Sequence, residues 1–414
     1  MGPTFVDVLG ERAAAAPGPA FEFVDRSRRV SLGYAGLDER ARSIGASLRA
    51  QGLSGARILV LLPPDLDFVA AVLGCWYAGA VAVPRPDREL SFVVDDADPA
   101  AAIVPPGMPL PGVVSFSLDA LAAPADGWRR PDIGPDSLAL LHYAGRHGVM
   151  VSHANLVAGA RQVGRIFGAG ADSSVVTRFG AYRGLVTGVL HPMLAGARTT
   201  LLPPHASPGE WLRAISDRGA RVSGGMERSF ARAAVADGLD DVDLSTWDIA
   251  FTDGSNATMD AFADRFVRNG FRRASVFPCY WLPEATALIA GRRGPVATRF
   301  DADTLAPGRL ARPRAEGTPV LDRGRPADEL QVAIVDPLTA TRCPDGTAGE
   351  IWVSGPNVAV GYLGRPEVSE RRFCARLRGS TDNFLRTGDV GFVHHGGLHV
   401  ADSLEVEHHA GVGA

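Results

Sequence analysis

The feature that most restricts the fold is a regular alternation of short apolar runs with amphipathic stretches. In order, Leu37–Leu53 has helical spacing, Ala56–Leu62 contains the strand-like run ILVLL, Leu66–Tyr77 has helical spacing again, and Ala80–Val83 suits a second strand. Such alternation is typical of βαβ units, in which a helix crosses back between parallel strands. The chain is therefore predicted to begin with a layered α/β fold.

The same rhythm continues for most of the chain and then changes. It recurs in Asn155–Phe167, Ser174–Thr177, Gly184–Leu194, Thr199–Leu202, Glu210–Arg218, Val222 and Phe230–Ala236. Pro99–Pro131 is rich in Ala, Pro and Asp, which favours loops with a short strand. From about Arg312, short strand-like runs alternate with Gly and Pro turns. We expect two layered αβα subdomains, at 1–165 and 166–311, and a small β-barrel-like subdomain with a truncated hinge at 312–414.

Charge and composition exclude several classes of protein. The net charge of -4 comes from mixed charges without long like-sign runs, which argues against a nucleic-acid partner. No apolar run reaches the roughly 18 residues of a membrane span, and the first residues lack a signal-peptide pattern. The four cysteines are far apart and lack CxxC or His-paired spacing, so we expect reduced thiols in a cytoplasmic protein.

The sequence contains no lysine. All 42 basic residues are therefore arginine. Any mechanism that requires a lysine amine from this sequence is excluded, whereas arginine supplies a planar, permanently charged fork of donors.

Six longer segments carry a family resemblance, and they occur in the family's order. They are ILVLLPPDLDFVAAVLGCWYAGAVAVP near the start, GVMVSHANL (Gly148–Leu156), GLVTGVLHPMLAGA (Gly184–Ala197), FPCYWLPEAT (Phe277–Thr286), GEIWVSGPNVAVGYLGRPE (Gly349–Glu367) and FLRTGDVGF (Phe384–Phe392). Together they resemble the adenylate-forming superfamily and, within it, the fatty acyl-AMP ligases. Ala287–Pro326 resembles the insertion that separates the acyl-AMP ligases from the acyl-CoA ligases.

The phosphate loop departs from the family. A typical member has YTSGSTGxPKGV, whose backbone amides, hydroxyls and lysine contact the triphosphate. Here five residues separate Tyr143 from Val149, half the length of the family loop, and the serine, threonine and lysine are gone. Arg146 and His147 carry polar groups, but a rigid guanidinium does not replace a backbone cradle. The comparison predicts loss of ordinary ATP binding.

A second departure lies in Arg178–Gly184, where the family commonly has His-Asp-Met before the glycine. Tyr182 and Arg183 stand there instead. Tyr182 either lines the substrate pocket or packs at the base of the following helix. His142, just before the shortened loop, is either an acid or base, since imidazole titrates near neutral pH, or a satisfied histidine at a strand end.

The segment Phe277–Thr286 preserves the family pattern best. The resemblance implies that Tyr280 stacks on adenine, Glu284 holds a magnesium ion if magnesium is retained, and Thr286 touches the α-phosphate. Trp281 stands where the family has glycine, so its indole is expected to fill part of the acyl or nucleotide cavity. Cys279 is read as a core thiol.

Two further positions match the nucleotide-binding residues of the family. Asp253 and Gly254 occupy the place of the adenine-flanking turn, although a turn alone also explains Asp and Gly there. Asp389 matches the aspartate that holds the ribose hydroxyls, with a turn-capping role as the alternative. Glu284 and Asp389, from the resemblance, and His142, from the chemistry of imidazole, are thus the catalytic candidates. The resemblance implies AMP or an acyl-adenylate as the residual ligand.

The family continues beyond this point into a mobile C-terminal domain that delivers a second lysine. Here the place of the hinge reads Ala401–Val406, and the sequence ends at Ala414. We expect the mobile domain to be absent. His394, His395 and His399 lack the spacing of a metal site, and no metal is assigned to them.

Three functions remain open. The first is a non-adenylating protein that binds an acyl chain, an acyl carrier protein or a partner enzyme of a lipid or polyketide assembly line. The second is an ATP-independent enzyme for acyl transfer, condensation or cyclisation in the same cleft. The third is a weakly active acyl-AMP ligase. The absent lysine and the shortened loop argue against the third function. The family's nucleotide-binding residues have not all been lost, because Tyr280, Glu284, Thr286 and Asp389 are retained.

Overall fold

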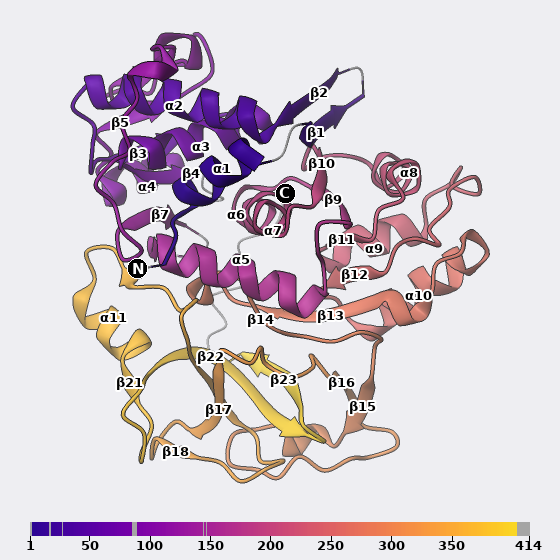
Figure 1. Cartoon of the computed structure of the whole chain (residues 1–414). Helices are drawn as coiled ribbons and strands as arrows, with labels where there is room; N and C mark the ends of the chain where they lie inside the picture. Colours follow the sequence, from indigo (N-terminus) through magenta and orange to yellow (C-terminus); the bar gives the residue numbers. More distant parts are fainter. Residues whose placement is uncertain are drawn as a thin grey trace. The chain divides into compact units, whose positions relative to one another are not determined.

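The structure is a computed structural model that describes residues 2–15, 18–26, 28–84, 89–143, 145 and 147–403 (Figure 1). The contacts divide the chain into two compact units. Unit 1 comprises residues 1–161, 169–206 and 362–364, and unit 2 comprises 162–168, 207–361 and 365–414. The three subdomain boundaries expected from the sequence stay predictions.

Unit 1 contains two groups of mainly parallel strands. The first has the order β8 (Val149–Ser152), β7 (Leu138–His142), β4 (Val81–Pro84), β3 (Arg57–Val60), β5 (Ala101–Ile103) and β6 (Ser115–Phe116). The second has the order β9 (Ser174–Arg178), β10 (Arg198–Leu202), β1 (Pro19–Asp25) and β2 (Arg28–Gly33). Each group ends in an antiparallel hairpin, β7–β8 in one and β1–β2 in the other.

The helices of unit 1 connect these strands. They are α1 (Phe5–Ala15), α2 (Tyr34–Ala50), α3 (Leu66–Ala78), α4 (Leu90–Ala97), the first part of α5 (His153–Phe167), α6 (Ala181–Leu185) and α7 (His191–Ala195). Helix α3 shows why the sequence folds this way. Its N-cap Asp65 accepts hydrogen bonds from the backbone of Asp67 and Phe68, and Gly79 ends it with φ of 76°. Every residue of α3 except Asp67 is buried, as its apolar sequence requires.

Unit 2 begins with a short, mostly parallel sheet. Strands β11 (Val222–Gly225), β12 (Ile249–Thr252) and β13 (Val276–Trp281) are parallel, and β14 (Leu288–Gly291) pairs with β13 in the antiparallel sense. The helices between them are α8 (Pro208–Arg218), α9 (Glu227–Ala234) and α10 (Asn256–Phe266). The loops that follow β12 and β13 lie at the carboxyl ends of these parallel strands, the usual place for a ligand in an α/β sheet.

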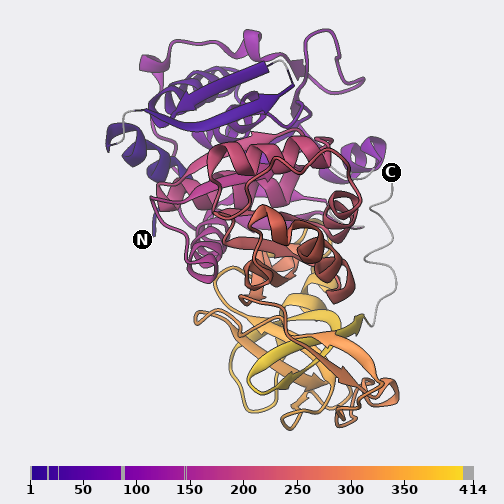
Figure 2. The same ribbon diagram turned by 90° about the vertical axis from the view of Figure 1, so that its right-hand side faces the viewer.

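The rest of unit 2 is antiparallel (Figure 2). Its main sheet has the order β18 (Thr341–Arg342), β17 (Gln331–Asp336), β19 (Gly349–Ser354), β22 (Asn383–His394) and β21 (Ala375–Arg376), and β23 (Gly397–Ser403) also pairs with β22. Strands β15 (Ala297–Phe300) and β16 (Thr318–Leu321) form a separate ribbon, and α11 (Pro366–Phe373) precedes β21. The pairings of the described strands do not close into a barrel.

The layered α/β fold expected from the sequence is confirmed, and the terminal β-rich part is an open sheet where a barrel-like form was expected. Antiparallel hairpins also interrupt the expected parallel order at β1–β2, β7–β8 and β13–β14. No helix in the described part of the chain combines the length and the apolar character needed to cross a membrane.

Candidate functional site

Tyr280 and Asp389 meet in unit 2 although they lie far apart in the sequence. The Tyr280 hydroxyl donates a hydrogen bond of 2.5 Å to Asp389 Oδ2, and both side chains are buried. Strand β13 carries the tyrosine to the carboxyl edge of the parallel sheet, and β22 carries the aspartate. Burial first, and then the Asp389 charge, raises the pKa of Tyr280 well above its ordinary value. The phenol therefore stays neutral and remains a donor.

The backbone beside Asp389 is fixed by a second set of contacts. The backbone N–H of Asp389 donates to Thr387 Oγ1 at 3.0 Å, and the Thr387 hydroxyl donates to the carbonyl of Ile351 at 2.7 Å. The N–H of Gly388 donates to Glu350 at 3.3 Å. These bonds tie the Thr-Gly-Asp turn to β19, so the Asp389 carboxylate has a defined position.

Glu284 lies in a single helical turn, Pro283–Ala285, directly after β13. The next residue but one, Thr286, has φ of 62° and ψ of -39°, a backbone conformation that costs of order 1–3 kcal/mol for a β-branched residue. Asn357 stabilises it. The side-chain amide of Asn357 donates to the backbone carbonyl of Ala285 at 2.8 Å, and the backbone carbonyl of Asn357 accepts the Thr286 hydroxyl at 2.6 Å. The Thr286 hydroxyl, which the resemblance places at the α-phosphate, belongs to a fully buried residue and donates to this Asn357 carbonyl instead.

Asp253 and Gly254 form the turn after β12. Asp253 Oδ1 accepts a hydrogen bond of 3.2 Å from the backbone of Glu227, and the Gly254 N–H donates to Thr252 Oγ1 at 2.9 Å. The Asp253 carbonyl accepts a bond of 3.3 Å from Arg323. The turn is thus tied to the start of α9 by Glu227 and to the segment after β16 by Arg323.

Trp281 belongs to an aromatic cluster of unit 2, defined as Phe167, Phe251, Phe277 and Trp281. Phe167 stacks on Phe251 with ring centroids 5.3 Å apart, and it contacts Phe277 and Trp281 edge-on at 5.6 and 6.5 Å. The indole is half-buried and also lies 6.0 Å from the Phe251 ring. At the position where the family has a glycine, this chain therefore has an indole packed against other aromatic rings.

The place of the phosphate loop in unit 1 is the short connection between β7 and β8. Strands β7 and β8 pair as far as His142 and Val149, and the Tyr143 side chain turns into the core, where its hydroxyl donates to Asp96 at 2.8 Å. A Cβ on Gly148 would lie 2.8 Å from the Tyr143 ring, so only glycine fits there. Ala144 and Arg146, named in the sequence comparison, lie outside the described residues.

His142 and Tyr182 stack on each other within unit 1, with ring centroids 4.0 Å apart and an interplanar angle of 16°. Both are buried, and burial lowers the pKa of His142 to about 3. The imidazole is therefore neutral at pH 7, and its pKa lies far from the range that suits general acid or base catalysis. Tyr182 is the second residue of α6 (Ala181–Leu185), and its place in a substrate pocket stays a prediction.

The predicted site residues thus fall into two sets. Tyr280, Glu284 and Asp389 belong to unit 2, and the Glu284 charge contributes to the raised pKa of Tyr280. His142 and Tyr182 belong to unit 1. Two residues that the sequence argument missed are Asn357 and Arg323. The stretch GPNVA, which contains Asn357, was quoted for the resemblance alone, and no sequence signal marks Arg323.

The unit 2 residues fit the nucleoside part of an adenylate better than its phosphates. Tyr280 offers a ring and Asp389 a carboxylate acceptor, the groups suited to a base and a ribose. The described residues contain no group of three or more His, Cys, Asp or Glu side chains placed to bind a metal.

Comparison with known proteins identifies the class. Residues 10–363 match the sequence profile of the family described as AMP-binding enzyme. This match covers most of the 414 residues, and the chain therefore belongs to the AMP-binding enzyme family.

Individual relatives point to fatty acyl-AMP ligases. The chain is 31% identical over 460 residues to the medium-chain-fatty-acid acyl-carrier-protein ligase JamA of Moorena producens, covering 97% of this chain and 77% of JamA. It is 32% identical over 437 residues to the long-chain-fatty-acid AMP ligase FadD23 of Mycobacterium tuberculosis, covering 91% and 74%. The crystal structure of the fatty acyl-adenylate ligase from L. pneumophila with acyl adenylate and pyrophosphate superposes with a TM-score of 0.91 at 27% identity, covering 97% and 77%. The resemblance found in the sequence is confirmed.

Proposed function

We propose that this chain binds an acyl group or an acyl-adenylate in the manner of fatty acyl-AMP ligases without forming the adenylate from ATP. The observation that carries the proposal is the short connection between β7 and β8. These strands pair as far as His142 and Val149, only five residues separate Tyr143 from Val149, and the Tyr143 side chain is buried. A loop of this length offers few backbone amides to a triphosphate, and the sequence has no lysine to neutralise one.

The adenosine-binding part of the fold supports binding. Asp389 has a carboxylate whose backbone is anchored at Gly388 and Thr387, and Tyr280 is fixed beside it. An adenylate would use the second carboxylate oxygen of Asp389 for its ribose hydroxyls or would displace the Tyr280 hydroxyl. The first arrangement adds a charge-assisted hydrogen bond, worth about 1.5–3 kcal/mol, whereas the second exchanges the bond from Tyr280 for one from the ribose.

We further propose that the acyl group comes from, or is passed to, an acyl carrier protein of a lipid or polyketide assembly line. The support is that JamA, a relative that aligns over nearly the whole chain, is named for a carrier-protein substrate. The competing function is a weakly active ligase, because the relatives are fatty acid ligases.

The binding proposal is tested by isothermal titration of the whole protein with a non-hydrolysable acyl-AMP analogue. Asp389→Asn is expected to weaken binding by about 10- to 100-fold, because it removes a charged acceptor. Tyr280→Phe should weaken binding by less, because it removes only a donor. Asp345→Asn, at an exposed turn of unit 2, is the matched control. Equal affinity in wild type and Asp389→Asn, or no binding at all, would reject the proposal.

A further inference from the structure

A short segment of unit 2, residues 322–326, is held in place by backbone contacts on two sides. The Arg323 N–H donates to the carbonyl of Leu398 in β23 at 2.8 Å, and the Leu398 N–H donates to the carbonyl of Gly324 at 2.9 Å. On the other side, a Cβ on Gly324 would overlap the carbonyl of Gly291, the last residue of β14. The backbone at Arg323 therefore has a defined position against both strands.

The same segment is connected through β23 to the strand that carries Asp389. Strand β23 pairs with β22 in the antiparallel sense, and Asp389 lies opposite Ser403 in this pairing. An isolated bridge between Asp322 and His399 adds to the contact of the segment with β23. Arg323 thus starts from backbone that is joined, by hydrogen bonds, to the strand of the aspartate proposed for the ribose.

The side chain of Arg323 reaches the other element proposed for the nucleoside, the turn after β12. Its Nη2 donates to the backbone carbonyl of Asp253 at 3.3 Å. The turn is also held from α9, because Asp253 Oδ1 accepts the N–H of Glu227 at 3.2 Å and Glu227 Oε1 accepts the Thr258 hydroxyl at 2.6 Å. The bond from Arg323 therefore joins the turn of the parallel sheet to the antiparallel part of unit 2.

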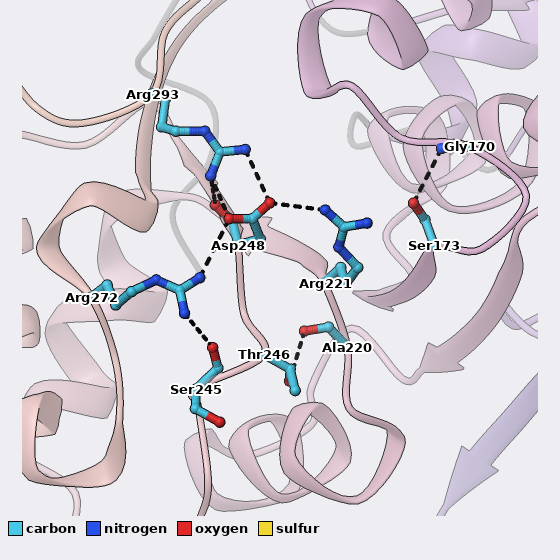
Figure 3. A network of polar contacts seen from close by, with 9 residues as sticks. All are labelled: Gly170, Ser173, Ala220, Arg221, Ser245, Thr246, Asp248, Arg272 and Arg293. Carbon is cyan, nitrogen blue, oxygen red and sulfur yellow. Dashed lines mark hydrogen bonds and ion pairs between the residues drawn. The ribbon is translucent and has the colours of Figure 1, made fainter.

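Other arginines hold the opposite end of the same strand. The carboxylate of Asp248, the residue directly before β12, is shared by Arg221, Arg272 and Arg293 (Figure 3). These three side chains are about half exposed, and their ion pairs fix the place where β12 begins. Arg323 acts at the place where β12 ends. One strand thus has arginines at both ends, and of these four it is Arg323 that contacts the turn.

We propose that Arg323 is a positioning residue that sets the turn at Asp253 relative to Asp389, and so makes the site selective for a complete nucleoside. The inference rests on the proposed function, because it concerns the same adenylate. Without the guanidinium, the turn keeps its bond to Glu227 but loses its link to the sheet of β22 and β23. Contacts that are arranged before binding cost less entropy when the ligand arrives, so base and ribose are recognised together.

The test uses two ligands that differ only in the base. Isothermal titration of the whole protein would compare a non-hydrolysable acyl-AMP analogue with the same molecule lacking its adenine ring. Wild type is expected to bind the complete analogue at least about 10-fold more tightly. Arg323→Met removes the donor and keeps an unbranched side chain, and it should lower this ratio by about 3- to 10-fold. Arg323→Lys keeps one donor and should retain part of the ratio, and it replaces Arg323→Met if that variant does not fold.

The matched control is Arg221→Met, the same substitution at the other end of β12. It removes one ion pair of Asp248 and should leave the ratio unchanged. Amide hydrogen exchange of the ligand-free proteins gives a second readout, because local opening is measured without any binding. Residues 253–255 should exchange faster in Arg323→Met than in wild type, and Arg221→Met should not change them.

The outcomes separate this inference from the proposed function. If wild type binds neither analogue, both are rejected. If wild type prefers the complete analogue and Arg323→Met keeps the same ratio, the positioning role alone is rejected. Equal weakening of both analogues in Arg323→Met would make Arg323 a purely structural residue, and equal affinity of wild type for the two analogues would show that the turn does not recognise the base. Unchanged exchange of residues 253–255 in Arg323→Met would also overturn the inference.

Discussion

Single residues decide which groups of the site can ionise. His142 is the clearest case, because it is buried against Tyr182 and burial lowers its pKa from 6.5 to about 3. His153 and His191 of the same unit are also buried, and their pKa values fall to about 4. All three are neutral in the folded protein at pH 5, whereas they bind protons in the unfolded chain. Their shared effect is a loss of stability in mild acid.

The sign of this effect gives the first prediction. Between about pH 6.5 and pH 3 the unfolded chain binds a proton at His142 that the native state does not, so stability falls as the pH falls. Replacing the ring by His142→Phe keeps the stacking on Tyr182 and should reduce the slope by up to about 1.4 kcal/mol per pH unit. Urea unfolding at pH 7, 6 and 5 measures it.

The control for this prediction is His205→Phe, at an exposed histidine of unit 1. This substitution should leave the slope close to that of wild type. An unchanged slope in His142→Phe would show that His142 is accessible to protons in the native state, and the acid or base role would then regain support.

At the same scale, the sequence predicts residue types and misses their contacts. Tyr280 and Asp389 could be chosen from motifs because a ring and a carboxylate suit adenosine, but a hydrogen bond across 109 positions leaves no local signal. Asn357 was missed for the same reason, since its two bonds reach the turn of Glu284 from another segment. Arg323 sits in a Gly- and Pro-rich stretch, where an arginine is ordinarily a solvated surface residue.

At the scale of elements, periodicity predicted the helices and the buried strands well. Helices α2 and α3 and strands β3 and β4 lie within a few residues of the stretches named from the sequence. The hairpins were not predicted, because a strand of four residues such as β8 or β14 has too few positions for its pairing direction to leave a pattern. The pairing of β7 with β8 matters most, since it extends to His142 and Val149 and so bounds the shortened loop on both sides.

The aromatic cluster gives the second prediction. Trp281→Gly should open space for longer acyl chains, because it restores the residue of the family at a position where the indole now packs against Phe167 and Phe251. The void should lower stability by about 3 kcal/mol. Titration with acyl-AMP analogues of increasing chain length measures the change in preference, and urea unfolding measures the cost.

The matched variant is Trp281→Phe, which keeps an aromatic ring in the cluster. It should bind the same chain lengths as wild type with a smaller loss of stability. If Trp281→Gly binds long and short chains as wild type does, the indole does not limit the acyl pocket. Loss of all binding in Trp281→Gly would instead make the indole a wall of a different site.

At the scale of the whole molecule, the chain combines the fold of the AMP-binding enzyme family with a composition that lacks lysine. It aligns with fatty acid ligases over more than nine-tenths of its length and superposes on an acyl-adenylate complex with a TM-score of 0.91. Yet all 42 of its basic residues are arginines. The fold alone does not decide between activity and binding, because function depends on the groups present at the site.

The last prediction follows from this contrast. Adenylation requires the charge of a triphosphate to be stabilised as the carboxylate attacks, and electrostatic groups placed for the transition state are usually the largest contribution to catalysis. Here only five residues separate Tyr143 from Val149 between β7 and β8, and the 414 residues supply no lysine for that task. Pyrophosphate exchange into ATP should therefore be at the background level with medium-chain and long-chain fatty acids, measured beside an intact acyl-AMP ligase. Glu284→Ala separates the alternatives, because a working ligase would need this carboxylate for magnesium. Exchange near the rate of the intact enzyme that Glu284→Ala abolishes would establish a ligase and reject the non-adenylating assignment, whereas background exchange together with Asp389-dependent binding of an acyl-adenylate is the result expected here.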